Sequence, residues 1–131
     1  MTLVVDAGLV VAALLDSGPD GTWAEEQLAA DHLAAPHLMP VEAANVLRRA
    51  ALAGEVSEDT ASMAYADLLA LRVELFPYEP FASRVWDLRM NVTAYDAWYV
   101  AVAESLQTQL VTLDKRLSRA PGCRCAFRTP S

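Results

Sequence analysis

The sequence predicts an α/β fold in which helices cover both faces of a mainly parallel, five-stranded central sheet. Short aliphatic runs alternate along the chain with longer segments of helical periodicity, a pattern typical of crossover connections between parallel strands. No internal repeat, low-complexity tract or long linker divides the chain. Its 131 residues are enough to bury a core, so we expect one domain over residues 1–131. The predicted architecture is a three-layer α/β/α sandwich.

The first part of the chain predicts a strand, an acidic turn and two helices before a second strand. Thr2–Val5 is β-branched and aliphatic, Asp6 follows it, and Leu9–Leu15 is long enough for two helical turns. We expect a second helix over Thr22–Ala30. A short strand over Leu33–Ala35 should then be closed by Pro36.

A longer helix is predicted from Pro40 to about Ala53, where Gly54 would end it. Its apolar residues recur at the spacing of one helical face, and its polar residues share a different face. Glu42 is therefore predicted to lie outside the core. The apolar face consists of Ala43, Val46, Leu47 and Ala50, and the polar face of Glu42, Asn45 and Arg49.

Two strands and three helices are predicted for the remainder. Ser57 should cap a helix to about Leu71, and Val73–Phe76 should form a strand ended by Pro77. Pro80 opens a further helix, and Thr93 should cap a helix from Ala94 to about Leu106. The inner face of the helix at Pro80 is predicted to carry Phe81, Val85 and Leu88, and Leu110–Leu113 is predicted to be a buried strand ending at Asp114.

Four acidic residues occupy positions where such a fold places binding sites. Asp6 and Asp114 follow apolar strands, whereas Glu42 and Asp96 lie in the first turns of predicted helices. In open α/β sheets ligands bind beyond the carboxyl ends of the strands, where the following helices begin, so the four carboxylates can share one site. Taken singly, each also has a simpler interpretation as a turn, cap or helix-dipole residue.

Crowded carboxylates repel one another, and a divalent cation would remove that repulsion. A set of oxygen ligands without His or Cys suits Mg2+ or Mn2+, and such a cation also binds phosphate oxygens. We therefore expect a Mg2+ or Mn2+ site formed by Asp6, Glu42, Asp96 and Asp114.

Charge is distributed unevenly along this acidic chain, whose net charge is −7. Residues 1–114 contain all 17 acidic residues and five basic ones, a net charge of −12, and the last 17 residues carry a net charge of +5. The acidic part could be balanced by a metal or a basic partner, or could simply be a solvated surface next to a basic tail.

Neither the cysteines nor the hydropathy pattern adds a further site. Cys123 and Cys125 are one residue apart and lack further ligands at zinc-site spacing, so we expect reduced structural thiols. The longest apolar run, Ala7–Leu15, is too short to span a bilayer. The first residues lack the pattern of a secretory signal, so we expect no membrane association and a cytoplasmic protein.

Four segments together resemble the PIN domain, and most closely the VapC toxins of type II toxin–antitoxin pairs. They are VVDAGLVVAALL from Val4, VEAANVLRR from Val41, TAYDAWYVAVAE from Thr93 and VTLDKRL from Val111. The resemblance implies that Asp6, Glu42, Asp96 and Asp114 bind the metal and are catalytic. It further implies an RNA substrate, a homodimer and a cognate VapB-like antitoxin that blocks the site.

One position departs from the family pattern. Many relatives have Ser two residues after the first Asp, where this chain has Gly8, and Thr112 is expected to supply a nearby hydroxyl in its place. Asn45 and Tyr95 match common family positions; Asn45 would support Glu42, and Tyr95 would either support the site or only pack.

The function expected from these residues is hydrolysis of RNA phosphodiester bonds by metal-activated water. Contacts to the RNA backbone are expected from Arg48, Arg49, Lys115 and Arg116, unless these side chains are only solvated. Two other α/β classes are disfavoured. A phosphoacceptor receiver domain would need adjacent acids after the first strand, which this chain lacks, and a HAD-type phosphatase would need an acid at the place of Gly8. The remaining alternative is a PIN-like protein that binds RNA or a protein partner without cleaving.

Overall fold

The computed structural model describes residues 1–131 and contains one sheet in which all five strands are parallel, in the order β3-β2-β1-β4-β5. The central strand β1 pairs with β2 on one side and with β4 on the other. The predicted α/β fold with a five-stranded parallel sheet is therefore confirmed. The strands are β1 (Thr2–Val5), β2 (His32–Pro36), β3 (Glu74–Phe76), β4 (Gln109–Val111) and β5 (Ala126–Arg128).

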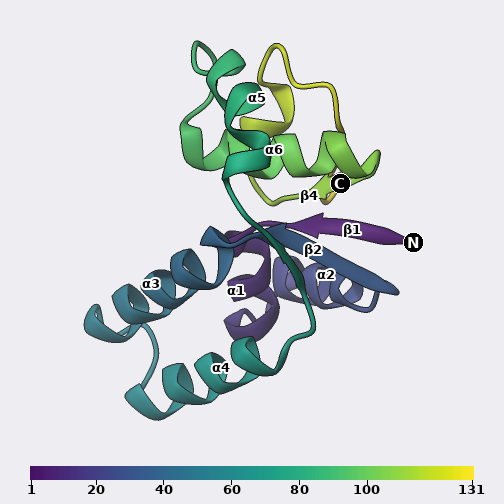
Figure 1. The fold of residues 1–131 in the computed structure, drawn as a ribbon. Coiled ribbons are helices and arrows are strands. Elements are labelled where there is room, and N and C mark those ends of the chain that lie inside the picture. Colours follow the sequence, from purple (N-terminus) through teal and green to yellow (C-terminus); the bar gives the residue numbers. More distant parts are fainter.

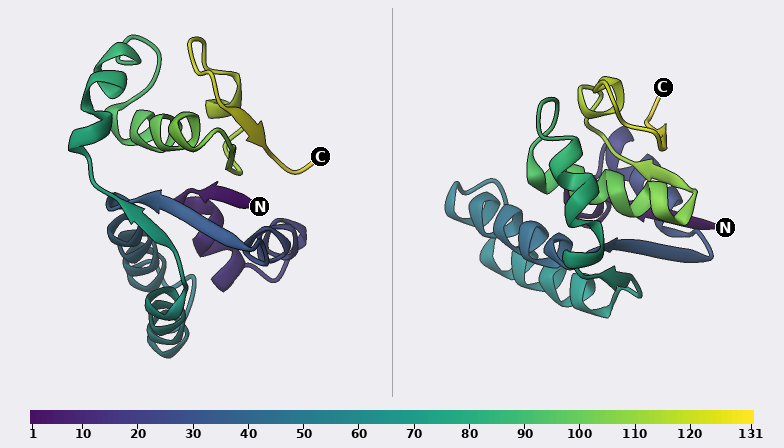
Figure 2. Two further views of the ribbon diagram at one scale, coloured as in Figure 1. Left: turned by 45° about the vertical axis from the view of Figure 1, so that its right-hand side comes forward. Right: turned by 45° about the horizontal axis from the view of Figure 1, so that its top comes forward.

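Helices cover both faces of the sheet, which gives the predicted three layers. The first four helices lie on one face and the last two on the other (Figure 1). The two further views in Figure 2 show the same separation, with the C-terminal segment on the side of the last two helices. The helices are α1 (Ala7–Leu15), α2 (Pro19–Leu28), α3 (Leu38–Leu52), α4 (Glu58–Ala70), α5 (Ala82–Asp87) and α6 (Ala94–Leu106), with single 3-10 turns at η1 (Glu79–Phe81) and η2 (Leu117–Arg119).

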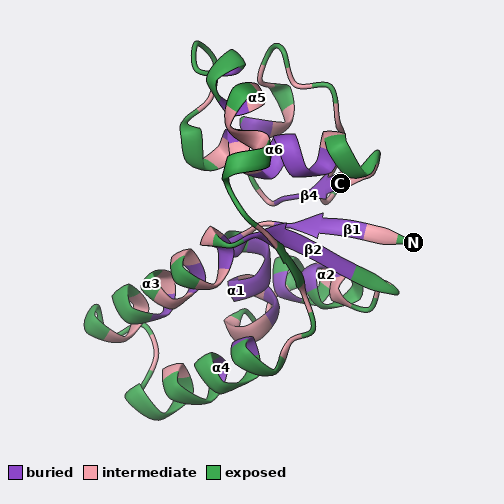
Figure 3. Cartoon of the chain, in the orientation of Figure 1, coloured by how far each residue is buried: buried purple, intermediate pink, exposed green.

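The core is one continuous cluster of 28 buried residues. Strand β1 and the middle of α6 contribute many of these residues, and both are buried in Figure 3. Burial of apolar surface is the main stabilising contribution to such a fold. No helix combines the length and the hydropathy needed to cross a membrane.

Several helix boundaries were predicted correctly because side chains fix them. Ser57 accepts the amide of Thr60 at the start of α4, and Thr93 accepts the amide of Asp96 at the start of α6. Gly54 follows the end of α3 with φ of 74°, a conformation that costs glycine little.

Four predicted helix starts were wrong by two or three residues. Pro80, predicted to open a helix, lies in the 3-10 turn η1, and helix α5 begins at Ala82. Helix α1 begins at Ala7 rather than Leu9, because Asp6 accepts the amide of Leu9 and caps it, and α2 begins at Pro19 rather than Thr22. Helix α3 begins at Leu38, so Pro40 lies within its first turn, where no amide is needed. Glu42 consequently lies in the second turn and not in the first.

The predicted ends of the strands also need correction. Strand β4 ends at Val111, so Asp114 lies three residues beyond it rather than directly at its end. Pro36, predicted to close β2, is its last residue, and β5 was not located by the sequence pattern. The deviations at β4 and β5 arise at strands of three residues, where pairing with neighbouring strands decides the boundary more than residue type does.

A partly buried charge network attaches the C-terminal segment to the last two helices. Arg84 of α5 forms a bidentate pair with Glu104 of α6 at 2.7 and 3.0 Å, and Arg84 also donates to the carbonyl of Gly122 at 2.7 Å. Glu104 accepts the backbone amide of Arg124 at 2.7 Å. Burial alone would raise the pKa of Glu104, but the bonds from Arg84 and the Arg124 amide lower it overall.

We predict that Glu104→Gln lowers the free energy of unfolding by about 1–3 kcal/mol, because Arg84 loses its charged partner inside the protein. Because folding lowers the pKa of Glu104, this stabilisation is fully present at pH values above the ordinary Glu pKa. It disappears as the pH falls through the pKa that Glu104 has in the folded protein. Urea unfolding should therefore separate the variant from the wild type at about pH 7 but hardly at about pH 3. The exposed, unpaired Glu25→Gln is the control, and an equal effect of both substitutions would contradict the assignment.

Candidate functional site

The site begins where the two central strands end side by side. Val5 of β1 lies opposite Val111 of β4, so the next residues along the chain, Asp6 and Thr112, are brought together. Asp6 is mostly buried and its Oδ1 accepts the amide of Leu9 at 2.9 Å. Thr112 is fully buried, and its hydroxyl lowers the pKa of the neighbouring Asp6 carboxyl group. The strand register thus places a hydroxyl beside the first acid.

Helices from opposite faces of the sheet supply the second acid and its partner. Glu42 projects from α3, and the hydroxyl of Tyr99 from α6 donates to Glu42 Oε1 at 2.7 Å. Tyr99 is 2% exposed, so its ring is part of the core while its hydroxyl reaches the site. Burial, followed by the hydrogen bond to Glu42, raises the pKa of Tyr99, so the phenol stays protonated and remains a donor.

Asp96 and Asp114 line one cleft at this edge of the sheet. The backbone holds Asp114 in place: its Oδ1 accepts the amides of Arg116 and Leu117 at 2.9 and 3.1 Å, and its own amide donates to Thr112 Oγ1 at 3.0 Å. Thr112 therefore connects the first and last of the four acids. The cap and turn roles considered for Asp6 and Asp114 are real, and they orient the carboxylates.

The four carboxylates influence one another electrostatically. Burial, with smaller contributions from the charges of Asp96 and Asp114, raises the pKa of Asp6 to about 6, although Thr112 and the Leu9 amide act in the opposite direction. Burial, then the charges of Asp114 and Glu42, raises the pKa of Asp96. Removing these groups from water while keeping them close to like charges is costly, and a cation at the site would offset that cost.

The donor set fits a hard divalent cation that keeps much of its water. In the structure, no three Asp, Glu, His or Cys side chains converge closely enough to enclose an ion by themselves. Mg2+ characteristically takes only one or two carboxylates directly and retains several waters, so an open group of oxygen donors suits it. The residues present therefore fit Mg2+ or Mn2+ bound partly through water, and they do not fit zinc.

Other residues considered from the sequence have different surroundings. Asn45 is exposed, and the hydrogen bond to Glu42 comes from Tyr99. Tyr95 is 62% exposed, so it does not pack in the core. A Cβ on Gly8 would lie 3.7 Å from Asp6 Oδ1, so a side chain at position 8 would be next to the acid. The sequence analysis missed Tyr99, although it lies three residues after Asp96 and thus on the same side of the helix.

The two cysteines are free and partly buried, away from these acids in the sequence. Burial raises the pKa of Cys123, and it raises the pKa of Cys125 to about 12. Thiolate is the reactive and metal-binding form, so both groups remain protonated structural thiols.

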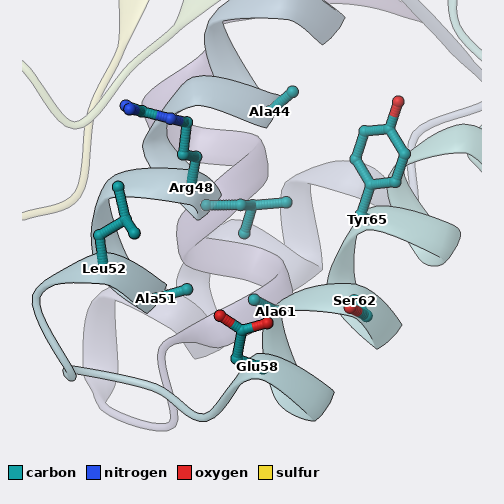
Figure 4. A pocket seen from close by; sticks show the side chains of 9 residues that line it. Ala44, Arg48, Ala51, Leu52, Glu58, Ala61, Ser62 and Tyr65 are labelled. Carbon is teal, nitrogen blue, oxygen red and sulfur yellow. The ribbon is translucent and has the colours of Figure 1, made fainter.

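A separate apolar groove of about 450 Å3 lies between α3 and α4 (Figure 4). Arg48 and Leu52 lie on the α3 side of this groove, and Tyr65 lies on the opposite helix. The groove contains none of the four carboxylates. Arg48, expected from the sequence to contact RNA, therefore belongs to a different surface from Asp96 and Asp114.

Comparison with known proteins agrees with this arrangement of strands and helices. The family model described as the PIN domain matches residues 3–122. The chain belongs to the PIN domain family. The resemblance and the architecture predicted from the sequence are thus confirmed.

Relatives of this PIN domain cover nearly its whole length. Ribonuclease VapC1 of Mycobacterium tuberculosis is 41% identical over 126 residues, which are 95% of each chain. The crystal structure of PAE2754 from Pyrobaculum aerophilum has a TM-score of 0.70 and 25% identity, over 97% of this chain and 89% of that one. VapBC-5 of M. tuberculosis, a member of the VapBC family of toxin–antitoxin systems, has a TM-score of 0.58 at 23% identity, over 98% and 96%.

We predict that Tyr99→Phe lowers the free energy of unfolding by about 1–3 kcal/mol, because it removes the hydrogen bond to a charged carboxylate without changing the ring. Tyr95→Phe makes the same chemical change at an exposed position of the same helix and should have no measurable effect. Urea unfolding of the two variants measures the difference. If Tyr99→Phe were as stable as the wild type, the bond to Glu42 would not hold the two helices together.

Proposed function

We propose that this PIN domain is a Mg2+- or Mn2+-dependent endoribonuclease and the toxin of a type II toxin–antitoxin pair. The observation that carries the proposal is that Asp96 and Asp114 line one cleft at the carboxyl ends of the strands, where Asp6 follows β1 and Tyr99 of α6 holds Glu42 of α3. Asp6 and Asp96 respond electrostatically to the other acids, which supports a common site. The names of the curated relatives as VapC ribonucleases support RNA as the substrate.

Each residue has a distinct part in the proposed hydrolysis. When bound, Mg2+ or Mn2+ supplies a water of lowered pKa and neutralises charge on the phosphate. Asp6, Glu42, Asp96 and Asp114 provide the oxygen ligands. Thr112 orients Asp6 and the Asp114 backbone, and Tyr99 holds Glu42 toward the site. Asn45 and Tyr95 have no part in this proposal, and no His or Lys general base is required.

We predict that Asp6→Asn, Glu42→Gln and Asp96→Asn each reduce RNA cleavage by at least about 100-fold, because each removes a charged ligand that positions the reacting groups. The fold should persist, since Glu42 and Asp96 are only partly buried and Asn conserves the shape of Asp at position 6. Cleavage of a labelled RNA pool with added Mn2+ measures the loss. Asp67→Asn, an exposed substitution of the same kind on α4, should cleave like the wild type.

Metal binding to the same variants can be measured without measuring RNA cleavage. Millimolar Mn2+ should raise the melting temperature of the wild type by about 4 °C for each 1 kcal/mol that bound metal adds to the free energy of unfolding, and should leave an Asp6→Asn/Asp96→Asn protein unchanged. The shift should shrink below about pH 6, because the raised pKa of Asp6 leaves that ligand protonated. A wild type that binds metal but cuts no RNA would favour a protein that binds without cleaving.

We propose that the partner is a VapB-like antitoxin, which the VapBC-5 complex supports by its similarity, and that the toxin itself is a homodimer. An unregulated ribonuclease would harm its own cell. A basic side chain from the antitoxin, Arg above all, could replace a metal ion among the four acids through charge-assisted hydrogen bonds. The net charge of −12 over residues 1–114 would also accelerate the approach of a basic partner.

We predict that the product of the adjacent open reading frame copurifies with the PIN domain and suppresses RNA cleavage. If the partner places a cation among the acids, Mn2+ should weaken the complex, and Asp6→Asn/Asp96→Asn should weaken it further than Asp67→Asn does. Size-exclusion chromatography with light scattering measures the complex and the homodimer together. A neighbouring protein that binds without inhibiting would refute the antitoxin assignment and leave the nuclease assignment intact.

A further inference from the structure

The acids of the site share their cleft with two arginines. This cleft, about 460 Å3 in volume, lies between the segment before α6 and the turn after β4. Asp96 and Asp114 line it together with Arg116 and Arg119. Asn91 and Thr93 add polar groups on the side of α6. The cleft therefore presents both signs of charge to whatever enters it.

None of these four charged side chains is paired with another. The protein contains two ion pairs, Met1 with Asp31 and Arg84 with Glu104. Arg116 and Arg119 are exposed, and neither guanidinium has a hydrogen-bond partner in the protein. The carboxylates thus remain free for a cation, and the guanidinium groups remain free for an anion.

The turn after Asp114 fixes where the two arginines project. Asp114 Oδ1 accepts the amides of Arg116 and Leu117, and Leu117 is buried in the core at 5% exposure. Arg116 precedes the 3-10 turn η2, and Arg119 is its last residue. Side chains three residues apart in a 3-10 turn point in the same direction, with about 6 Å of rise between them. The same carboxylate therefore contributes to the proposed metal site and orients the basic pair.

The other arginines do not line this cleft, and Arg49 lies in the last turn of α3. Arg84 is paired with Glu104, Arg89 lies 4.6 Å from the centre of the Trp86 ring, and Arg128 donates to Gln27. Arg48 lines the groove between α3 and α4. Arg72 and Arg124 lie near the amino-terminal ends of the strands, away from the carboxylates.

We propose that Arg116 and Arg119 bind backbone phosphates of the RNA next to the bond that is cut and so position the strand across Asp96 and Asp114. The proposal rests on the ribonuclease function proposed above. A guanidinium group matches a phosphate with two parallel hydrogen bonds, which makes arginine well suited to this contact. Neighbouring phosphates are bound equally in the ground state and the transition state, so these arginines are positioning residues that act mainly on KM.

The test compares two double variants with the same change in charge. Arg116→Gln/Arg119→Gln should lower kcat/KM for a random-sequence, labelled 12-nucleotide RNA by about tenfold or more, mainly through KM. Arg72→Gln/Arg124→Gln removes two exposed charges at the opposite end of the sheet and should change it by less than about twofold. The slope of log KM against log salt concentration should fall by about 1.4 in the first variant only, the value for two single-strand phosphates.

A conservative variant separates charge from structure. Arg116→Lys/Arg119→Lys should restore the salt slope while recovering only part of the affinity, since Lys carries the charge without the planar pair of donors. Equal effects of the two Gln variants on KM and on the salt slope would overturn the inference and leave the ribonuclease function standing. Failure of the wild type to cleave RNA in Mn2+ would overturn the proposed function, and with it the inference.

Discussion

Parallel pairing of β1 with β4 is the constraint on which the rest of the site depends. Because Val5 and Val111 lie opposite one another, both strands end at the same level, and the chain leaves them at Asp6 and Thr112. A shift of this register would separate the acid from the hydroxyl and move apolar residues out of the core. The order of the sheet, with β1 and β4 at its centre, also places the acids where helices from both faces begin.

The contact between Tyr99 and Glu42 joins the layers at the same edge. Helices α3 and α6 lie on opposite faces of the sheet, and this hydrogen bond at 2.7 Å connects them beyond the strand ends. A neutral phenol can hold Glu42 without cancelling its charge, whereas a lysine or arginine there would compete with a metal ion. The raised pKa values of Asp6 and Asp96 reflect what this arrangement costs, namely the partial burial of carboxylates close to like charges.

The parts of this fold that local chemistry determines could be predicted from the sequence, and those that depend on distant contacts could not. Ser57 and Thr93 mark helix starts through bonds to amides three residues away, so their signals are local. Strand β5 was not located because three residues of an edge strand carry too little pattern, and its place depends on pairing with β4. The four acids were selected by position, but Tyr99 resembled a core residue because its hydroxyl finds its acceptor 57 residues away.

A net charge of −7, taken as a sum, would argue against a nucleic-acid partner. At physiological ionic strength the Debye length is about 8 Å, so exposed acids on distant parts of the surface are largely screened from a strand at the cleft. Charges in contact with the ligand are screened much less. The turn at Asp114 brings acids and arginines into one cleft without pairing them. The acids therefore remain available to a metal ion, and the arginines remain available to a phosphate. Local placement of a few groups, rather than the net charge of −7, therefore decides whether this protein can hold a polyanion.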